Sequence, residues 1–389
     1  MNQHTNTVIK TKEVQRSDID VRSSYLCFPN WSQPIWTLLT GKPLKNEKPL
    51  INFTPPQHLL FDISIAIILM IIFYNLIQQD EGIFSYLKYI LTPFFSLYFT
   101  GFFRKLQVVY GHHAIHLNLF KNKQLNTTAS KIFTVISISQ NEIDYKEDHL
   151  DHHRNTIFTT INDADANLLH KFGIKSGKSK NALLTQLVKT IFSLKFHLHF
   201  LVLRIKSNFK RNIFANVTVI FWLAIVLVLL PVIFGFYFTF FVFLLPLTFL
   251  YQTSAILQFS TEHVWLVGEA PNKNLEKYAA RCIGRFCGEM TPDTKISFNN
   301  LLLWMTWWLR TIFIHIPTRM AVLVGDLPAH DWHHLAPVIK HSSKNWHIAI
   351  YERQRAIDNK NSLSMENREC WGLPSMMDYV FIRMSENID

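Results

Sequence analysis

The sequence has few charged residues and few cysteines for its length. Asp, Glu, Lys and Arg make up 17% of the 389 residues, against about 25% in typical soluble domains. The four cysteines (Cys27, Cys282, Cys287 and Cys370) are scattered and show no C-x-x-C spacing. A disulfide framework and a cysteine zinc site are therefore not expected. Residues 1–50 lack the pattern of a cleaved signal peptide, so the first apolar segment is expected to act as its own insertion signal.

Long apolar segments are abundant instead. Apolar residue types make up 49% of the chain and include 32 Phe. A helix needs about 20 apolar residues to cross a bilayer, and four segments meet that length. They are residues 59–77, 83–103, 213–233 and 235–259. The first two and the last two are joined by very short connections, so the sequence predicts two transmembrane hairpins.

Basic residues predict the orientation of these hairpins. The segment from Arg104 to Arg211 contains seventeen Lys and Arg, whereas the connection 78–82 contains only acidic charges and the other hairpin tip has none. The positive-inside rule then places the middle segment, the N-terminus and everything after Phe259 in the cytosol. The expected location is the bacterial inner membrane, or the endoplasmic reticulum in a eukaryote. The net charge of +11 fits this excess better than a nucleic-acid surface, which would also need exposed aromatic residues.

The expected fold class is an all-α integral membrane protein. It has four transmembrane helices in two hairpins, interfacial helices, and a cytosolic helical cap that carries a histidine-rich site. Residues 181–210 and 298–324 are apolar but interrupted by Lys and Arg, which favours interfacial helices; a fifth and sixth crossing stay open. The expected parts are a cytosolic N-terminal arm at 1–55, the membrane domain at 56–340 and a cytosolic C-terminal tail at 341–389.

Three clusters among the 18 histidines have the spacing of metal ligands. They are His112-His113-Ala114-Ile115-His116, His149-Leu150-Asp151-His152-His153 and His330-Asp331-Trp332-His333-His334. Residues at i, i+3 and i+4 share one face of a helix, so each cluster can present its imidazoles together. Several imidazoles without a thiolate suit a metal that binds O₂ or water. An even number of crossings separates the clusters, so all three can meet on one side of the membrane.

This order of motifs resembles the membrane fatty acid desaturase and hydroxylase superfamily. The first cluster, followed by Leu119-Phe120, is similar to the family's first box, H-D/E-A-x-H, although His113 stands where the family has an acid. His333-His334-Leu335-Ala336-Pro337 is similar to the H-H-L-x-P end of the third box. The resemblance covers about residues 59–337. It leaves open whether His113 or a remote carboxylate supports the site.

The resemblance implies two iron ions held by eight box histidines and a ninth after the last span. The eight are His112, His116, His149, His152, His153, His330, His333 and His334. His263 is the preferred ninth ligand, because it follows the fourth span, and His315 is the alternative. Asp151, Asp331 and Glu262 have two interpretations, as carboxylates that orient an imidazole N–H or as solvated residues. His197, His199, His341 and His347 are interpreted as packing or surface residues.

The implied activity is an O₂-dependent membrane oxidoreductase acting on a long-chain acyl or lipid substrate, with fatty acid desaturation as the first choice. A hydroxylase, a ketolase and a terminal-alkene-forming fatty acid decarboxylase of the same superfamily are the alternatives. The sequence leaves open the chain length, the position of attack, whether the substrate is free or linked to CoA, a carrier or a lipid, and the oligomeric state. Electrons are expected from a separate ferredoxin or cytochrome b5-like protein with its reductase. A non-enzymatic metal or lipid-binding protein is the less favoured reading.

Overall fold

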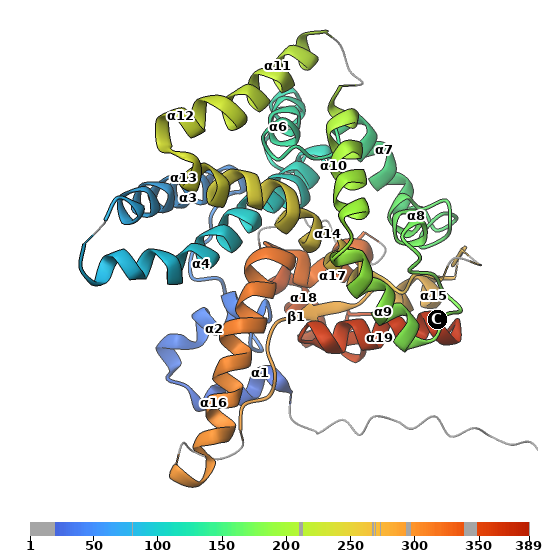
Figure 1. Cartoon of the computed structure of the whole chain (residues 1–389). Coiled ribbons are helices and arrows are strands. Elements are labelled where there is room, and N and C mark those ends of the chain that lie inside the picture. The colour runs from blue at the N-terminus through green and yellow to red at the C-terminus, as the bar shows by residue number, and fades with distance from the viewer. Residues whose placement is uncertain are drawn as a thin grey trace, which may run out of the picture.

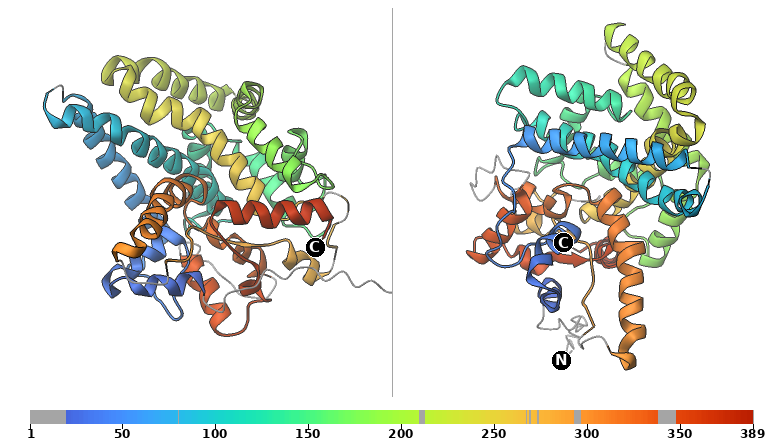
Figure 2. Two further views of the ribbon diagram at one scale, coloured as in Figure 1. Left: turned by 60° about the horizontal axis from the view of Figure 1, so that its bottom comes forward. Right: turned by 90° about the vertical axis from the view of Figure 1, so that its left-hand side faces the viewer.

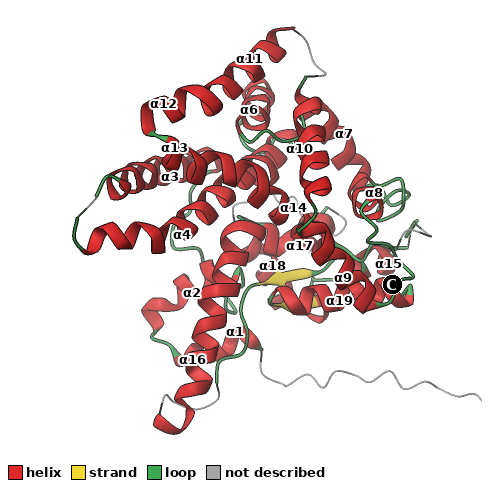
Figure 3. Ribbon diagram, viewed as in Figure 1, coloured by secondary structure: helices red, strands yellow, loops and turns green. Residues whose placement is uncertain are grey.

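The computed structural model describes residues 20–79, 81–209, 213–266, 268, 270–272, 274–292, 297–337 and 348–388. Most of these residues are helical, as the all-α expectation requires (Figure 3). The difference is one pair of short parallel strands, β1 (Gly284–Phe286) and β2 (Glu369–Trp371). The first helices are α1 (Val21–Ser24), α2 (Gln33–Thr40), α3 (Pro55–Ile77), α4 (Ile83–Lys105), α5 (His112–Ile115), α6 (Lys123–Ile136), α7 (Glu142–His152), α8 (Ala164–Lys171), α9 (Lys180–Ile191) and α10 (Leu194–Asn208). The later helices are α11 (Ile213–Ala224), α12 (Leu230–Phe234), α13 (Phe236–Thr239), α14 (Tyr251–Glu262), α15 (Leu275–Ala280), α16 (Leu301–Arg310), α17 (His330–Leu335), α18 (Ala349–Asp358) and α19 (Leu373–Glu386).

Three helical runs are long and apolar enough to cross a membrane. They are Pro55–Ile77, Ala215–Phe234 and Phe236–Glu262. The predicted second span, α4, has 23 residues but includes Lys88 and is not among these three. It nevertheless packs along α3, where the rings of Phe73 and Phe95 lie 4.7 Å apart between centroids. The long helices lie together on one side of the molecule (Figure 2).

Local sequence explains where the long helices begin and turn. α3 begins with a capping box of Thr54 and Gln57 and with Pro55 in its first turn, a combination that favours a helix start. Each hairpin turn contains a glycine in the left-handed region, Gly82 with a φ of 72° and Gly235 with a φ of 83°. Only glycine adopts this conformation without a steric cost from Cβ. The two turns therefore match the predicted hairpin connections.

The second span carries the first histidine cluster as a rigid extension. α4 continues through a π-helical turn, Leu106–Gly111, directly into α5. At Gly101 the helix touches the chain at Met320 so closely that a Cβ would collide with the Met320 carbonyl oxygen. α4 is thus fixed against the helical run that leads to the third cluster, and the two clusters are held in one frame.

The two segments expected at the interface are helical. Residues 181–210 form mainly α9 and α10, separated at Phe192 and Ser193. The segment Phe298–Val322 is helical and bends by 80° into Leu327–Leu335, and by length and composition alone this pair could be a broken span. Phe298, Leu302 and Phe313 on it are largely exposed. In Figure 1, α16 runs across the direction of α3 and α4 rather than beside them.

The described segments nearest both ends of the chain, residues 20–40 and 369–388, fold onto the histidine-bearing part. Tyr25 and Trp36 of the N-terminal arm pack with Trp304 and Trp307 of α16 in one buried aromatic cluster. In the described part of the predicted C-terminal tail, β2 pairs with β1, and Phe381 of α19 is fully buried. These contacts tie residues near both ends of the chain to the elements that hold the third cluster.

Candidate metal centre

Four segments deliver the histidines of the three clusters and His263. α5 supplies the first cluster, α7 the second and α17 the third, and His263 follows directly after α14. α7 begins at Asn141, whose side chain accepts hydrogen bonds from the backbone N–H groups of Ile143 and Asp144, as an N-cap residue does. The predicted i, i+3, i+4 spacing therefore lies on the helices α5, α7 and α17 and the residues that directly follow them.

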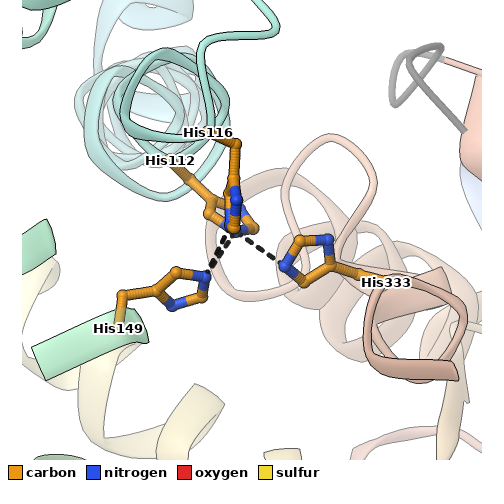
Figure 4. A group of neighbouring side chains, drawn as sticks. All are labelled: His112, His116, His149 and His333. Atoms are coloured by element: carbon orange, nitrogen blue, oxygen red, sulfur yellow. Dashed lines mark hydrogen bonds between the residues drawn. The ribbon is translucent and has the colours of Figure 1, made fainter. Parts of the chain in front are cut away.

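The first group of imidazoles consists of His112, His116, His149 and His333. Their potential ligand atoms all lie within 4.8 Å of one another, and the rings point toward a common centre (Figure 4). The Nε2 atoms of His112 and His149 are 3.0 Å apart, and so are those of His112 and His333. His153 adjoins this group, because its Nε2 lies 3.0 Å from Nε2 of both His149 and His333.

The second group consists of His152, His263, His330 and His334, all of them buried. Nε2 of His152 lies 3.2 Å from Nε2 of His263, and Nε2 of His334 lies 3.1 Å from that of His330. The ring of His153 stacks on His334 with a centroid distance of 4.3 Å. The two groups are therefore neighbours, and all nine predicted histidines lie in or beside them.

The nitrogen spacing and the donor chemistry suit metal ions. Two nitrogens bound about 2.1 Å from one ion at a right angle are about 3.0 Å apart, close to the distances seen here. Burial lowers the pKa of His112, His149, His263 and His330 well below its usual value. These imidazoles are then neutral and can each offer a lone pair. Imidazole suits iron, zinc and copper, so the donor set fits iron.

Hydrogen bonds to Nδ1 orient the second group. Nδ1 of His152 lies 2.7 Å from the buried carboxylate of Asp163, and Nδ1 of His263 donates to the carbonyl oxygen of Arg281. Nδ1 of His334 lies 2.8 Å from the hydroxyl of Tyr278. Burial alone would lower the pKa of His152, but the Asp163 carboxylate raises it to about 9. Such partners hold the ring, make it a stronger base and leave Nε2 for a metal.

Sequence reasoning missed Asp163, Arg281 and Tyr278. Asp163 does carry one local signal, since it is the N-cap of α8 and accepts a hydrogen bond from the N–H of Asp165. Nothing in the sequence connects that cap with a histidine eleven positions earlier. Contacts of this kind depend on how the chain between the two residues folds back.

The predicted supporting residues have different environments. Nε2 of His113 lies 2.9 Å from the Asp326 carboxylate, outside both groups. Asp331 is buried but pairs with Arg353 rather than with an imidazole. Arg353 also pairs with Glu369 of β2, so Asp331 fastens α17 to α18 and β2. Neither the orienting nor the solvated interpretation of Asp331 describes this arrangement.

Asp151, Glu262 and His315 lie in three different environments. Asp151 is an exposed partner of Arg154, which matches its solvated interpretation. Glu262 is buried, with Oε1 at 3.2 Å from Nε2 of His330 and 3.4 Å from Nη2 of Arg285, so it belongs to the site. His315 is buried beside Gly372, away from both groups. The structure thus brings His263, and not His315, to the other histidines.

The histidines interpreted as structural are also placed. Nδ1 of His197 lies 2.6 Å from Oε1 of Gln252, and Nε2 of His197 donates to the carbonyl oxygen of Ile191. Both of its nitrogens are therefore used within the fold. His199 is exposed and lies beside Phe172. His341 and His347 lie outside the described residues.

Two cavities are each bordered by several of the histidines, whereas a third, of about 700 Å³, reaches only His153. The larger of the two, about 440 Å³, is bordered by His112, His149, His152 and His330. The smaller, about 340 Å³, is bordered by a different set, His113, His116, His153, His333 and His334. The two linings share no residue, so the imidazoles separate two spaces. The larger volume is in the range of small-molecule sites.

The comparisons with known proteins agree with this arrangement. The fatty acid desaturase family model matches residues 89–342, a range that contains all three clusters and His263. No curated protein and no solved structure matches the chain.

Replacing Asp163 should weaken metal binding more than replacing Asp151. Asp163→Asn removes the charge beside His152 but keeps an N-cap acceptor for α8, so we expect a 10- to 100-fold loss of metal affinity, as for other orienting carboxylates. Asp151→Asn is the matched control and should leave affinity unchanged, because its partner is the exposed Arg154. Competition of the purified variants with a chelator, followed by elemental analysis, measures both. Equal affinities for the two variants would contradict the role given to Asp163.

Proposed function

The chain belongs to the fatty acid desaturase family, and on that premise we propose that it desaturates an acyl chain in an O₂-dependent reaction. Family membership implies an oxidoreductase of the desaturase and hydroxylase type. The observation that carries the finer proposal is the pair of imidazole groups with nitrogens about 3 Å apart. The proposed ligands are the nine histidines His112, His116, His149, His152, His153, His263, His330, His333 and His334.

The proposed metal is a pair of irons. Bound there, they would supply the O₂-dependent removal of hydrogen from an unactivated C–H bond. Removal of two hydrogens from adjacent carbons gives one C=C bond, and with two electrons and two protons from outside, one O₂ leaves as two waters. Imidazoles suit this because their ring nitrogens offer lone pairs to iron. Asp163, Tyr278 and the Arg281 carbonyl hold three of the rings in place.

The larger cavity is the proposed site of the acyl chain. Phe259, Val108 and Leu327 contribute apolar surface beside the histidines. Holding a chain at a fixed depth brings one pair of carbons to the oxidant and excludes water, which accelerates reaction at that position. Hydrogen abstraction followed by return of a hydroxyl would give an alcohol instead, so the products decide between desaturation and hydroxylation.

The proposed topology places the centre on the cytosolic side, at the ends of four transmembrane helices. The many bases between α4 and α11 and the absence of bases at the hairpin tips support it. A cytosolic reductant, such as a ferredoxin or a cytochrome b5-like protein, then reaches the centre directly. The basic surface favours an acidic donor, because opposite charges steer association.

Ligand substitution tests the proposed activity. His149→Ala and His330→Ala should abolish product formation and lower the iron content, while the protein still inserts in the membrane. His199→Ala is the control and should retain turnover, since this side chain is exposed and remote from both groups. The measurement is mass spectrometry of products after supplying acyl substrates, O₂ and a reductase–ferredoxin pair. Equal losses in all three variants would indicate a folding defect instead of a metal site.

Labelling tests the proposed topology. Single cysteines placed near His153 and near His334, in a variant without the four native cysteines, should react from the same, cytosolic side of sealed oriented vesicles. The reason is that both positions must reach one centre, which requires an even number of crossings between them. Reaction from opposite sides would mean that Phe298–Val322 crosses the membrane once, and the shared centre would then be ruled out.

A further inference from the structure

A buried arginine without a carboxylate partner borders the larger cavity. Arg104, near the end of α4, is 1% exposed and precedes His112 in one helical run by about 12 Å of rise. Its Nη2 donates to Oε1 of Gln258, and its Nε has no hydrogen-bond partner among the described residues. In the same part of the chain it has no ion pair either. A charge in the interior without a counter-charge is strongly unfavourable.

A second arginine adds to the positive charge at this place. The guanidinium carbons of Arg204 and Arg104 lie 3.8 Å and 5.1 Å from the centroid of the Tyr251 ring. Arg204 donates to the carbonyl oxygens of Ser137, Ile138 and Leu247, which satisfies its hydrogen bonds but not its charge. Burial, together with the charge of Arg104, lowers the pKa of Arg204 to about 10. Both cations therefore stand beside one buried ring.

None of the four carboxylates that border the cavity forms an ion pair with Arg104 among the described residues. Glu262 contacts Arg285 and His330, and Arg104 reaches it only through the amide of Gln258. Asp144, Asp148 and Asp165 border the cavity from α7 and α8. Asp148 accepts a hydrogen bond from Gln140, and Asp144 accepts one from Ser207. The Arg104 guanidinium is thus left without a carboxylate partner among the described residues.

The rest of the lining suits a hydrocarbon chain. Phe200, Leu203, Ala255 and Phe259 border the same cavity of about 440 Å³. α14, which carries Tyr251, packs against both α4, which carries Arg104, and α10, which carries Arg204. One space therefore combines apolar walls, a buried cation and two histidines from each group.

We propose that Arg104 binds the carboxylate of the substrate, so that the substrate is a free carboxylic acid. This inference rests on the proposed function and specifies its substrate class. A guanidinium matches a carboxylate with two parallel hydrogen bonds, whereas an ester or thioester carbonyl brings no charge to neutralise Arg104.

Binding measurements test this without turnover. Isothermal titration of the purified full-length protein with dodecanoate, methyl dodecanoate and dodecyl phosphate compares a carboxylate, a neutral ester and a phosphate. We expect the wild type to bind dodecanoate at least about tenfold more tightly than the ester, as a charge-assisted pair requires, and more tightly than the phosphate. Arg104→Gln should remove the preference over the ester and leave ester affinity unchanged. Arg104→Lys keeps a cation but loses the planar guanidinium, so it should retain part of the preference for dodecanoate over the ester.

Lys171→Gln is the matched control, because Lys171 borders the same cavity but is exposed. It should keep the full preference for dodecanoate. The proposal is overturned if the wild type binds acid and ester equally, if the phosphate binds more tightly than the acid, if Lys171→Gln alone removes the preference, or if both Arg104 variants keep it. If Arg104→Gln binds neither dodecanoate nor the ester, the ratio of the two affinities in Arg104→Lys decides. Product formation is measured separately, so failure of the oxygenase reaction and failure of carboxylate binding are distinguishable.

Discussion

The fold is organised around buried, mostly uncharged imidazoles that contact one another. Nitrogens of residues as distant in sequence as His112 and His333 approach to 3.0 Å. Such rings repel one another when protonated, and burial keeps most of them neutral. Holding them together without a metal requires several rigid elements. The continuous helix from α4 into α5, the start of α7 at Asn141 and the contacts of α17 with α18 and β2 supply that rigidity.

Charged residues around the centre are arranged in fixed pairs. Arg353 joins Asp331 of α17 to Glu369 of β2, and Lys42 of the N-terminal arm pairs with the same glutamate. Removing one partner of such a buried pair leaves the other charge uncompensated and is strongly destabilising. These pairs tie the N-terminal arm and β2 to α17 and so hold the third cluster in position. Arg104 stands out against this background, because the described residues give it no comparable partner.

Sequence periodicity predicted the elements better than their contacts. Long apolar runs and His spacing depend on neighbours along the chain, so α3, the later spans and the three histidine helices could be anticipated. α4 is less apolar than α3 and is not among the helices long and apolar enough to cross a membrane. Its part as a span stays a prediction, as do the domain boundaries and the cytosolic orientation. The β1–β2 pair, the carboxylate of Asp163 beside His152 and the Arg353–Asp331 pair join distant residues. No local sequence pattern predicts contacts between such distant residues.

The two imidazole groups are proposed to hold two irons. X-ray absorption at the iron edge of active, purified protein tests this directly. We expect about two irons per chain and no sulfur neighbour. The nitrogen and oxygen neighbours should lie at about 2.0–2.2 Å, as is usual for imidazole and carboxylate ligands. The absence of sulfur follows from the four cysteines, none of which belongs to either group. Sulfur at about 2.3 Å, or full activity with less than about one iron per chain, would contradict the account.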